Sequence, residues 1–386
     1  MSYKASGGMN PLKGATIHQV TAGFAQGDAI SDEARNIRQV LRSWGCLSEI
    51  YAWPESIHPE TRVECRPVTE LDQRTCDLLI YHYSIGSPAT RSILEYGCPK
   101  VMIYHNVTPS SFFRVYNPEI ADELGRGRRQ LGAIRNAFSL ALADSEFNRK
   151  ELEELGYPRT AVLPILFDPR RLRVGLRERS RARWQRRRRE TTIFFVGRLV
   201  PNKKAEDLLR AFSFYQRLCD RRSRLIWVGS AGGMELYANH LLSLIESLGI
   251  RHVRFVGHVS RSQLTSWYLA GDVFASASEH EGFCVPILES FHFGRPVVAF
   301  GAAAVPETVG DAGLLVATKE PEIFASAIYR VASDPNLRAE LVSRGHRRVS
   351  EHFGRERVAS ILQECLTAEL TRHGASVGLK RGDNPL

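Results

Sequence analysis

Several features that mark special classes of protein are missing from this sequence of 386 residues. No stretch reaches the ~18 apolar residues that a membrane-spanning helix requires. The first residues, MSYKASGGMNP, lack the apolar core of a secretory signal peptide. The seven cysteines are odd in number and include no C-x-x-C pair, which favours reduced thiols. No G-x-x-x-x-G-K-[ST] loop is present, which excludes a P-loop ATPase. A cytoplasmic protein is therefore expected.

The positive charge is concentrated in one segment. Residues 170–189 hold eleven arginines against one acid, Glu178, which accounts for the whole net charge of +10. The rest of the chain is neutral, so a nucleic-acid-binding surface is not expected. The segment is either a solvated linker or a peripheral anchor to an anionic membrane surface, where Trp184 would sit at the lipid interface. A second basic patch on the first domain could add to the anchor: Arg126, Arg128, Arg129 and Arg135.

Short apolar runs alternate with amphipathic stretches, which is the pattern of βαβ units. In the first half, strands are expected at residues 15–21, 47–52, 76–83, 101–104 and 138–144. In the second half, strands are expected at residues 192–196, 224–228, 253–256, 273–275, 296–300 and 313–316. The pattern predicts an α/β protein with one doubly wound sheet in each half.

The arginine-rich segment marks the join between two domains, predicted to span residues 1–175 and 190–360. Ser145 has the sequence context of a helix cap. Residues 320–370 are expected to be helical, and residues 361–386, the helix end and tail, are expected to pack back on the first domain. Because such sheets bind ligands at the carboxyl ends of their strands, the two domains should face a shared cleft.

Residues 278–296 contain the densest group of candidate site residues. Glu281 and Glu289 lie eight positions apart, with Pro286 between them at a favourable first position of a helix. A helix start with free N–H groups is a phosphate seat. Glu281 would lie ahead of that seat, and Glu289 would project from the first turn behind it. A phosphate flanked by hydroxyl-rich groups, as in a nucleotide sugar, suits this arrangement.

The run E-G-F-C-V-P-I-L-E-S followed by G-R-P-V-V-A resembles the E-x7-E signature of the retaining glycosyltransferases of family four, and G-R-L-V-P-N-K resembles the G-R-L-x-x-x-K loop of the same family. The resemblance implies the GT-B fold, in which two Rossmann-like domains face a cleft. It implies transfer of a mannose- or glucose-type hexose from a GDP- or UDP-linked donor to a saccharide or lipid-linked acceptor, as in polysaccharide or glycolipid biosynthesis. No separate cofactor is implied.

The resemblance also assigns roles within the second half. Arg198 and Lys203 would hold the donor's phosphates, Glu289 the ribose hydroxyls, and Glu281 the transferred sugar. The backbone of three further residues would contact sugar or phosphate: Gly282, Phe283 and Cys284. Lys204 stands where the family usually has glycine, and either adds a cation or points to water. Cys284 also replaces a common glycine, and we expect a small buried residue and not a nucleophile.

In the first half, His105 at a strand end is expected to orient the acceptor or sugar or to stabilise charge, with His82 at the preceding strand end as a weaker candidate. Gly27 and Asp28, in the loop after the first strand, could contact the acceptor or the donor sugar. No D-x-D pair is present to hold a divalent ion, so a metal site is not expected. The loop Gly229–Gly233 lacks dinucleotide-binding spacing and is interpreted as part of the nucleotide pocket.

Readings other than a glycosyltransferase remain open from the sequence. A nucleotide-sugar epimerase or a phosphorylase could use the same fold, although no cofactor-bearing lysine site can be identified. A non-catalytic relative that binds sugars or a partner protein is the other alternative. The presence of Arg198, Lys203, Glu281 and Glu289 argues against lost catalysis.

Overall fold

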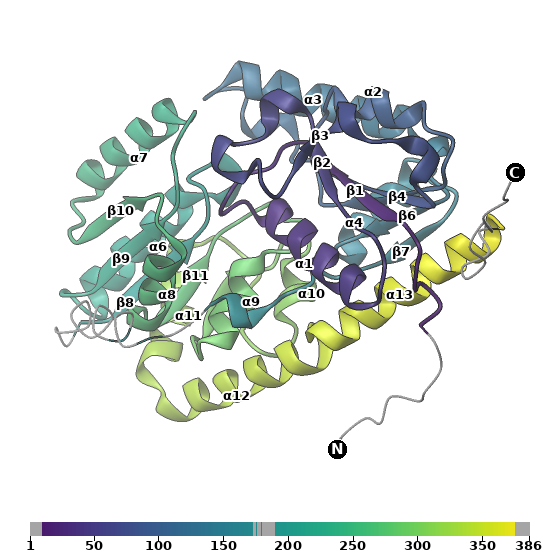
Figure 1. Cartoon of the computed structure of the whole chain (residues 1–386). Coiled ribbons are helices and arrows are strands. Elements are labelled where there is room, and N and C mark those ends of the chain that lie inside the picture. The colour runs from purple at the N-terminus through teal and green to yellow at the C-terminus, as the bar shows by residue number, and fades with distance from the viewer. Residues whose placement is uncertain (1–9, 173–174, 176–178, 180–189, 375–386) are drawn as a thin grey trace, which may run out of the picture.

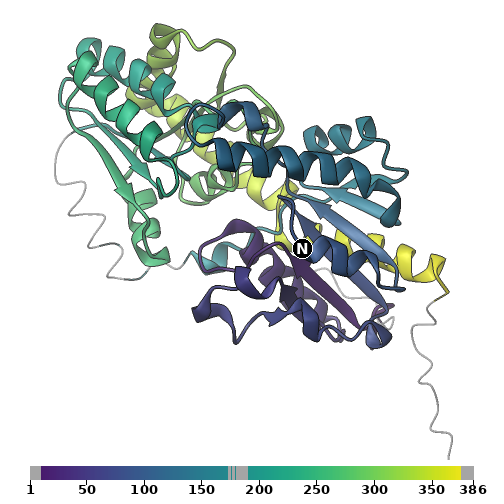
Figure 2. The ribbon, with the colours of Figure 1, turned by 90° about the horizontal axis from the view of Figure 1, so that it is seen from above.

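The computed structural model of the chain describes residues 10–172, 175, 179 and 190–374 (Figure 1). It contains two sheets in which all strand pairings are parallel, in the orders β3-β2-β1-β4-β5-β6-β7 and β10-β9-β8-β11-β12-β13. The predicted pair of doubly wound domains is confirmed. In Figure 2 the two domains lie side by side, and α13 (yellow) passes from one to the other.

The first domain is built on seven strands with helices on both faces. Its strands are β1 (Ile17–Thr21), β2 (Ile50–Ala52), β3 (Arg66–Pro67), β4 (Leu78–Tyr83), β5 (Lys100–Tyr104), β6 (Leu140–Ala143) and β7 (Thr160–Val162). Its helices are α1 (Ala29–Ser43), α2 (Ala89–Leu94), α3 (Pro118–Ala133) and α4 (Glu146–Glu154). The central strand β4 is buried along its whole length, as expected for a parallel sheet covered on both faces.

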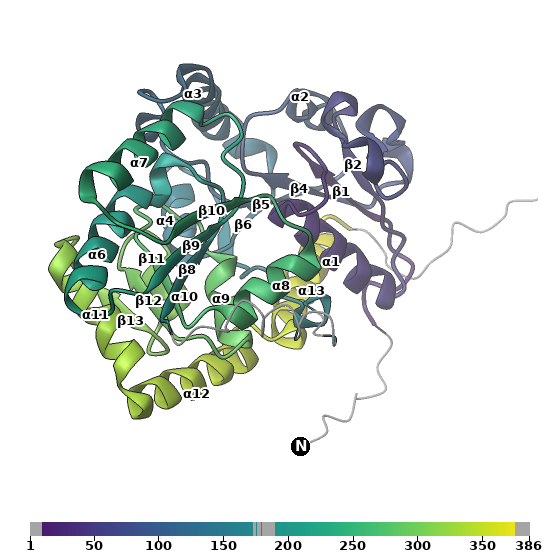
Figure 3. The same ribbon diagram turned by 90° about the vertical axis from the view of Figure 1, so that its left-hand side faces the viewer.

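The second domain repeats this arrangement. Its strands are β8 (Thr192–Val196), β9 (Arg224–Val228), β10 (Val253–Gly257), β11 (Val273–Ser276), β12 (Val297–Phe300) and β13 (Leu314–Val316). Its helices are α6 (Ala205–Leu218), α7 (Glu235–Leu248), α8 (Arg261–Ala270), α9 (Val285–His292), α10 (Val305–Val309), α11 (Pro321–Ser333) and α12 (Pro335–His352). Figure 3 shows α8 beside α1 of the first domain, where Arg261 pairs with Asp32.

The helical region expected at residues 320–370 is three helices and not one. Asp334 ends α11 and caps α12 by accepting hydrogen bonds from the N–H groups of Asn336 and Leu337. Gly354 then separates α12 from α13 (Arg355–Arg372). The chain can therefore change direction twice, which a single helix could not do.

Helix α13 runs along the first domain beneath its sheet (Figure 1). Its buried side chains share an apolar cluster with α1 and the first sheet: Val358, Leu362, Leu366 and Leu370. Arg159, next to β7, forms an ion pair with buried Glu369 of this helix. The C-terminal helix thus ties the second domain back to the first. Within the described ranges, none of the helices has the length and apolar composition of a membrane span.

Candidate functional site

The loop around Gly282 packs closely against the first domain. A Cβ atom at this position would lie 2.8 Å from both the carbonyl oxygen of His105 and the Cβ of Asn106. Ser145, the cap of α4, donates from Oγ to the carbonyl oxygen of Gly282 at 2.7 Å. Only glycine fits this approach. The backbone that the sequence assigns to a ligand therefore lies against the carboxyl ends of β5 and β6.

A set of polar side chains next to Gly282, which the sequence reading did not identify, bridges the domains. Oδ1 of Asn106 lies within hydrogen-bond distance of His280 Nε2, at 2.7 Å. Nδ2 of Asn106 donates to Asn148 Oδ1 at 2.8 Å. Asn202 donates to the carbonyl oxygen of His280 at 2.9 Å. Burial lowers the pKa of His280 to about 4, so its ring is neutral. Among the described residues, the buried Asn148 Nδ2 has no hydrogen-bond partner.

Lys203 and Glu281, expected to contact phosphate and sugar respectively, form an ion pair with each other. Both side chains are largely buried, at 18% and 8% exposure. The other oxygen of Glu281, Oε1, is buried without a partner among the described residues. Arg198 is exposed, and its NH2 group donates to Gly232 of the Gly229–Gly233 loop at 3.4 Å. The cationic loop and that glycine loop therefore lie together, as the pocket interpretation requires.

Lys204 stands where the family usually has glycine, and its side chain lies beside two carboxylates. Its backbone has a left-handed conformation with φ of 51°, which explains why glycine suits this position. Its ammonium lies 3.4 Å from Glu279 and 3.7 Å from Glu206. Burial lowers the pKa of Lys204, but these two carboxylates outweigh burial and raise it. The side chain is thus an ion-paired structural cation.

The start of α9 holds two further expected site residues. Cys284 is 6% exposed and has φ of 73°, again a glycine-like conformation. Burial raises the pKa of its thiol, as expected for a residue that is not a nucleophile. The Phe283 ring is buried edge-to-face against Phe353, so only its backbone is left for a ligand.

The sequence predicts that Glu289 lies in the first turn of the helix. In the structure it is the fifth residue of α9 and therefore lies in the second turn. Its carboxylate accepts a hydrogen bond from the hydroxyl of buried Tyr268 at 2.5 Å. Burial raises the pKa of Glu289, while Tyr268 and nearby Arg261 act in the opposite direction. A second, unfilled acceptor position remains on such a carboxylate for a ribose hydroxyl.

His105 and His82 belong to one buried network. Gln19 donates from Nε2 to the carbonyl oxygen of Ala34 at 3.1 Å, so its Oε1 accepts from His82 Nε2 at 2.9 Å. His82 Nδ1 must then accept from His105 Nε2 at 2.9 Å. His105 Nδ1 lies 3.0 Å from Asp144 Oδ2. One proton is therefore shared between His105 and Asp144, and neither ring nitrogen of His105 faces a ligand.

The carboxyl of Glu33 completes this network. It lies 3.8 Å from His105 and is 1% exposed, and both its oxygens lack hydrogen-bond partners among the described residues. Burial and Asp144 raise its pKa to about 8. Burial disfavours the His105 imidazolium, but Asp144 and Glu33 raise its pKa to about 9. Ligand atoms of Glu33, His105 and Asp144 lie within 4.8 Å of one another.

Gly27 and Asp28 lie on the exposed loop after β1, facing the second domain. Asp28 caps α1, because its Oδ2 accepts from the N–H and the hydroxyl of Ser31 at 2.8 and 2.7 Å. Gly27 has φ of 79°, and a Cβ there would lie 3.6 Å from the ring of His258. The carboxylate of Asp28 is thus engaged by its own helix.

Comparison with known families identifies the second domain. Residues 190–334 match the family model described as Glycosyl transferases group 1. The matched residues lie within the second domain. The D-inositol 3-phosphate glycosyltransferase of Saccharomonospora viridis is 36% identical over 203 residues, covering 50% of this chain and 47% of that protein. The same enzyme of Corynebacterium diphtheriae is 36% identical over 151 residues, covering 38% and 35%. The matches thus span half or less of these relatives.

The group 1 assignment agrees with the overall structure. HepE of Anabaena, solved in complex with UDP and glucose, superposes with a TM-score of 0.70 at 19% identity, covering 92% of this chain and 100% of that one. This likeness confirms the predicted GT-B fold. Arg198, Lys203, Glu281 and Glu289 all lie within the matched group 1 segment, whereas His105 lies in the first domain, outside it.

Proposed function

We propose that the protein is a retaining glycosyltransferase that moves a glucose- or mannose-type hexose from a nucleoside-diphosphate sugar to a saccharide or lipid-linked acceptor. The observation that carries the proposal is the buried Lys203–Glu281 pair beside the Gly282 loop. In this pair a cation suited to binding phosphate contacts a carboxylate whose other oxygen, Oε1, has no hydrogen-bond partner among the described residues. The pair lies where the two domains of the GT-B fold meet. The UDP and glucose bound to HepE favour a UDP-linked donor.

In the proposed mechanism, Lys203 exchanges its partner when the donor binds. Its ammonium moves from Glu281 to the diphosphate, and Glu281 becomes free to accept hydrogen bonds from sugar hydroxyls. Arg198, at the exposed edge of the same loop, binds the outer phosphate oxygens. Both cations contact the diphosphate once the donor is bound, and so stabilise the charge that develops on the leaving group.

The chemistry needs no protein nucleophile. The acceptor oxygen bonds to the anomeric carbon on the face from which the diphosphate departs, and the acceptor's proton passes to a phosphate oxygen of that leaving group. The products are the glycoside, with the donor's anomeric configuration, and the nucleoside diphosphate. Cys284 is unsuited to attack because its thiol is buried and its pKa is raised.

The proposal is tested with the full chain, UDP-glucose or GDP-mannose, and a panel of saccharide and lipid-linked acceptors in excess EDTA. We expect release of nucleoside diphosphate that depends on an acceptor, and a product whose anomeric configuration, measured by NMR, matches that of the donor. Inversion of configuration, or activity that disappears on chelation and returns with magnesium or manganese, would overturn the mechanism. Donor binding without transfer to any acceptor would favour a non-catalytic relative.

A further inference from the structure

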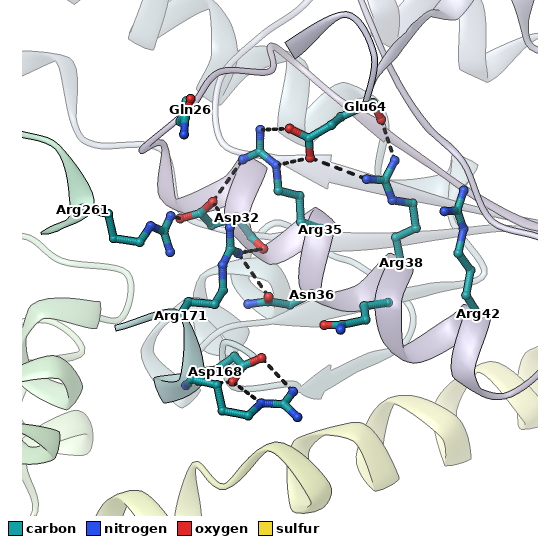
Figure 4. A pocket seen from close by; sticks show the side chains of 12 residues that line it. Gln26, Asp32, Arg35, Asn36, Arg38, Arg42, Glu64, Asp168, Arg171 and Arg261 are labelled. Atoms are coloured by element: carbon teal, nitrogen blue, oxygen red, sulfur yellow. Dashed lines mark hydrogen bonds and ion pairs between the residues drawn. The ribbon is translucent and has the colours of Figure 1, made fainter. Parts of the chain in front are cut away.

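A cavity of about 780 Å³ lies at the junction of the domains, next to α1 (Figure 4). One wall is α1 of the first domain, and another is the turn Pro169–Arg171 before the second domain. Arg261, the first residue of α8, reaches it from the second domain. We call this cavity the arginine groove. Arg198, Lys203, Glu281 and Glu289 do not line it, although Arg261 and Asp32 lie near enough to Glu289 to shift its pKa.

Cationic side chains dominate the arginine groove. Arg35, Arg38 and Arg42 recur at helical spacing on one face of α1. With three others they give six arginines against three carboxylates, a net charge of +3 for the lining: Arg35, Arg38, Arg42, Arg170, Arg171 and Arg261, with Asp32, Glu64 and Asp168. Such an excess of positive charge attracts anions.

The cations are crowded enough to disfavour one another's charge. Burial lowers the pKa of Arg38, and neighbouring Arg42 and Arg35 lower it further, although Glu49 and Glu64 oppose the effect. Burial likewise lowers the pKa of Arg171, with Arg261 and Arg35 adding to the effect although Asp32 opposes it. An anion placed between these groups would relieve the repulsion.

The arginines also retain hydrogen-bond donors. A guanidinium carries five N–H donors. Among the described residues, Arg38 donates one hydrogen bond, to the carbonyl oxygen of Glu64 at 2.5 Å, and Arg261 donates one, to Asp32 at 2.5 Å. Arg38 also lies 3.7 Å from the carboxylate of Glu64 and 4.0 Å from that of Glu49, so its other N–H groups have ion-pair partners without short hydrogen bonds.

We propose that the arginine groove binds a phosphate-bearing ligand that bridges the two domains. Guanidinium forks match phosphate oxygens in geometry and charge, and the cavity has the size of a small-molecule site. Asp32 now occupies the centre of the cluster, with Arg35, Arg171 and Arg261 at 3.0, 2.8 and 2.5 Å. A phosphate group joins Asp32 in contacting Arg171 and Arg261, and so links the interdomain turn to α8.

The test uses the full chain and inorganic pyrophosphate as the probe, measured by calorimetry at low salt in the presence of saturating UDP. We expect binding with a Kd below about 1 mM. The pair of changes Arg38→Gln and Arg171→Gln should weaken it at least ~10-fold, because each removes a charge-assisted contact. Arg261→Gln should weaken it similarly from the other domain. Arg74→Gln, at a side chain that is 86% exposed, removes one charge as Arg261→Gln does and is the control for that variant.

Other results would overturn the assignment. Loss of pyrophosphate binding in Lys203→Ala together with full binding in the groove variants would place the anion at the donor's phosphate seat instead. Equal loss in Arg74→Gln would reduce the effect to net charge. Because the test needs no glycosyl transfer, it stands even if the proposed function fails. Full pyrophosphate binding in groove variants whose thermal unfolding matches that of the parent protein would also contradict the proposal.

A second arm identifies the source of the phosphate. The same variants are sedimented with vesicles of phosphatidylcholine containing phosphatidylglycerol. Sedimentation that is lost in the groove variants and displaced by pyrophosphate would support a lipid headgroup as the ligand. Pyrophosphate binding with no groove-dependent sedimentation would support a soluble phosphorylated compound. Failure of both arms would overturn the proposal.

Discussion

His82 Nδ1 lies 2.9 Å from His105 Nε2, and the two ring planes are within 2° of parallel. The sequence offered these histidines as competing candidates, one at each strand end, but the structure makes them one unit. Because Asp144 contacts the other nitrogen of His105, its ring is fixed by hydrogen bonds at both nitrogens. His105 can therefore act through its charge and through the position of its backbone beside Gly282.

The hydrogen-bonded chain of His82, His105 and Asp144 predicts that substitution of any one of the three lowers the turnover rate. His105→Ala, His82→Ala and Asp144→Asn should each lower kcat by roughly 10-fold or more, because each breaks the chain that holds the imidazolium. The double variant His82→Ala/His105→Ala should be little worse than either single variant, since residues acting as a unit are not additive. Steady-state kinetics with the active donor checks this. Full kcat in His105→Ala beside an inactive His82→Ala would place the function at His82 alone.

The same network predicts how stability depends on pH. The pKa of Glu33 rises to about 8 and that of His105 to about 9 in the folded protein, both above their ordinary values. The folded state therefore holds more protons than the unfolded state. The stability that Glu33 contributes falls as pH rises from about 4.5 to 8, and the stability that His105 contributes falls as pH rises from about 6.5 to 9. Denaturant unfolding at several pH values measures the slope. In Glu33→Gln the slope should flatten, and an unchanged slope would contradict the assignment to this carboxyl.

Local patterns predicted most of the fold. The strands at 192–196 and 224–228 have the expected bounds, because each is a continuous apolar run of a parallel sheet. The edge strands β3 and β7 were missed: β3 has two residues and includes Pro67, and β7 is only half-buried. Short edge strands carry little apolar signal.

The site was predicted less completely than the fold, because its contacts join residues far apart in the chain. Motif spacing named Lys203 and Glu281, but nothing local shows that they bind each other across 78 positions. Glu33 reads as an ordinary polar residue of an amphipathic helix, and only the tertiary fold places it beside His105. Asn148 sits in a helix-start motif that explains its presence without any ligand. Only the folded chain shows these pairings.

The two cations expected to bind the donor's phosphates should affect catalysis to a similar extent but stability differently. Arg198→Ala should lower kcat/KM by roughly 10²-fold with little change in thermal stability, because the side chain is exposed. Lys203→Ala should lower kcat/KM by a similar factor and also destabilise the fold, because it leaves Glu281 buried without its partner. Lys204→Ala, the neighbouring cation, is the comparison and should be milder. Kinetics and thermal unfolding of the three variants decide this, and near-normal rates for both Arg198→Ala and Lys203→Ala would move the phosphates elsewhere.

The last prediction concerns the arginine-rich segment. Trp184 and the arginines at 186–189 lie outside the described residues, so their role is argued from charge alone. Basic residues near an anionic membrane contribute ~1 kcal/mol each, and the four arginines at 186–189 would suffice for salt-sensitive attachment. Replacing these four with glutamine should reduce sedimentation with phosphatidylglycerol vesicles at low salt, while pyrophosphate binding in the arginine groove stays intact. A parent protein that remains in the supernatant at low salt would make the segment a plain linker and favour a soluble acceptor. Because the groove and the segment are changed by different substitutions, the two anion-binding hypotheses can fail independently.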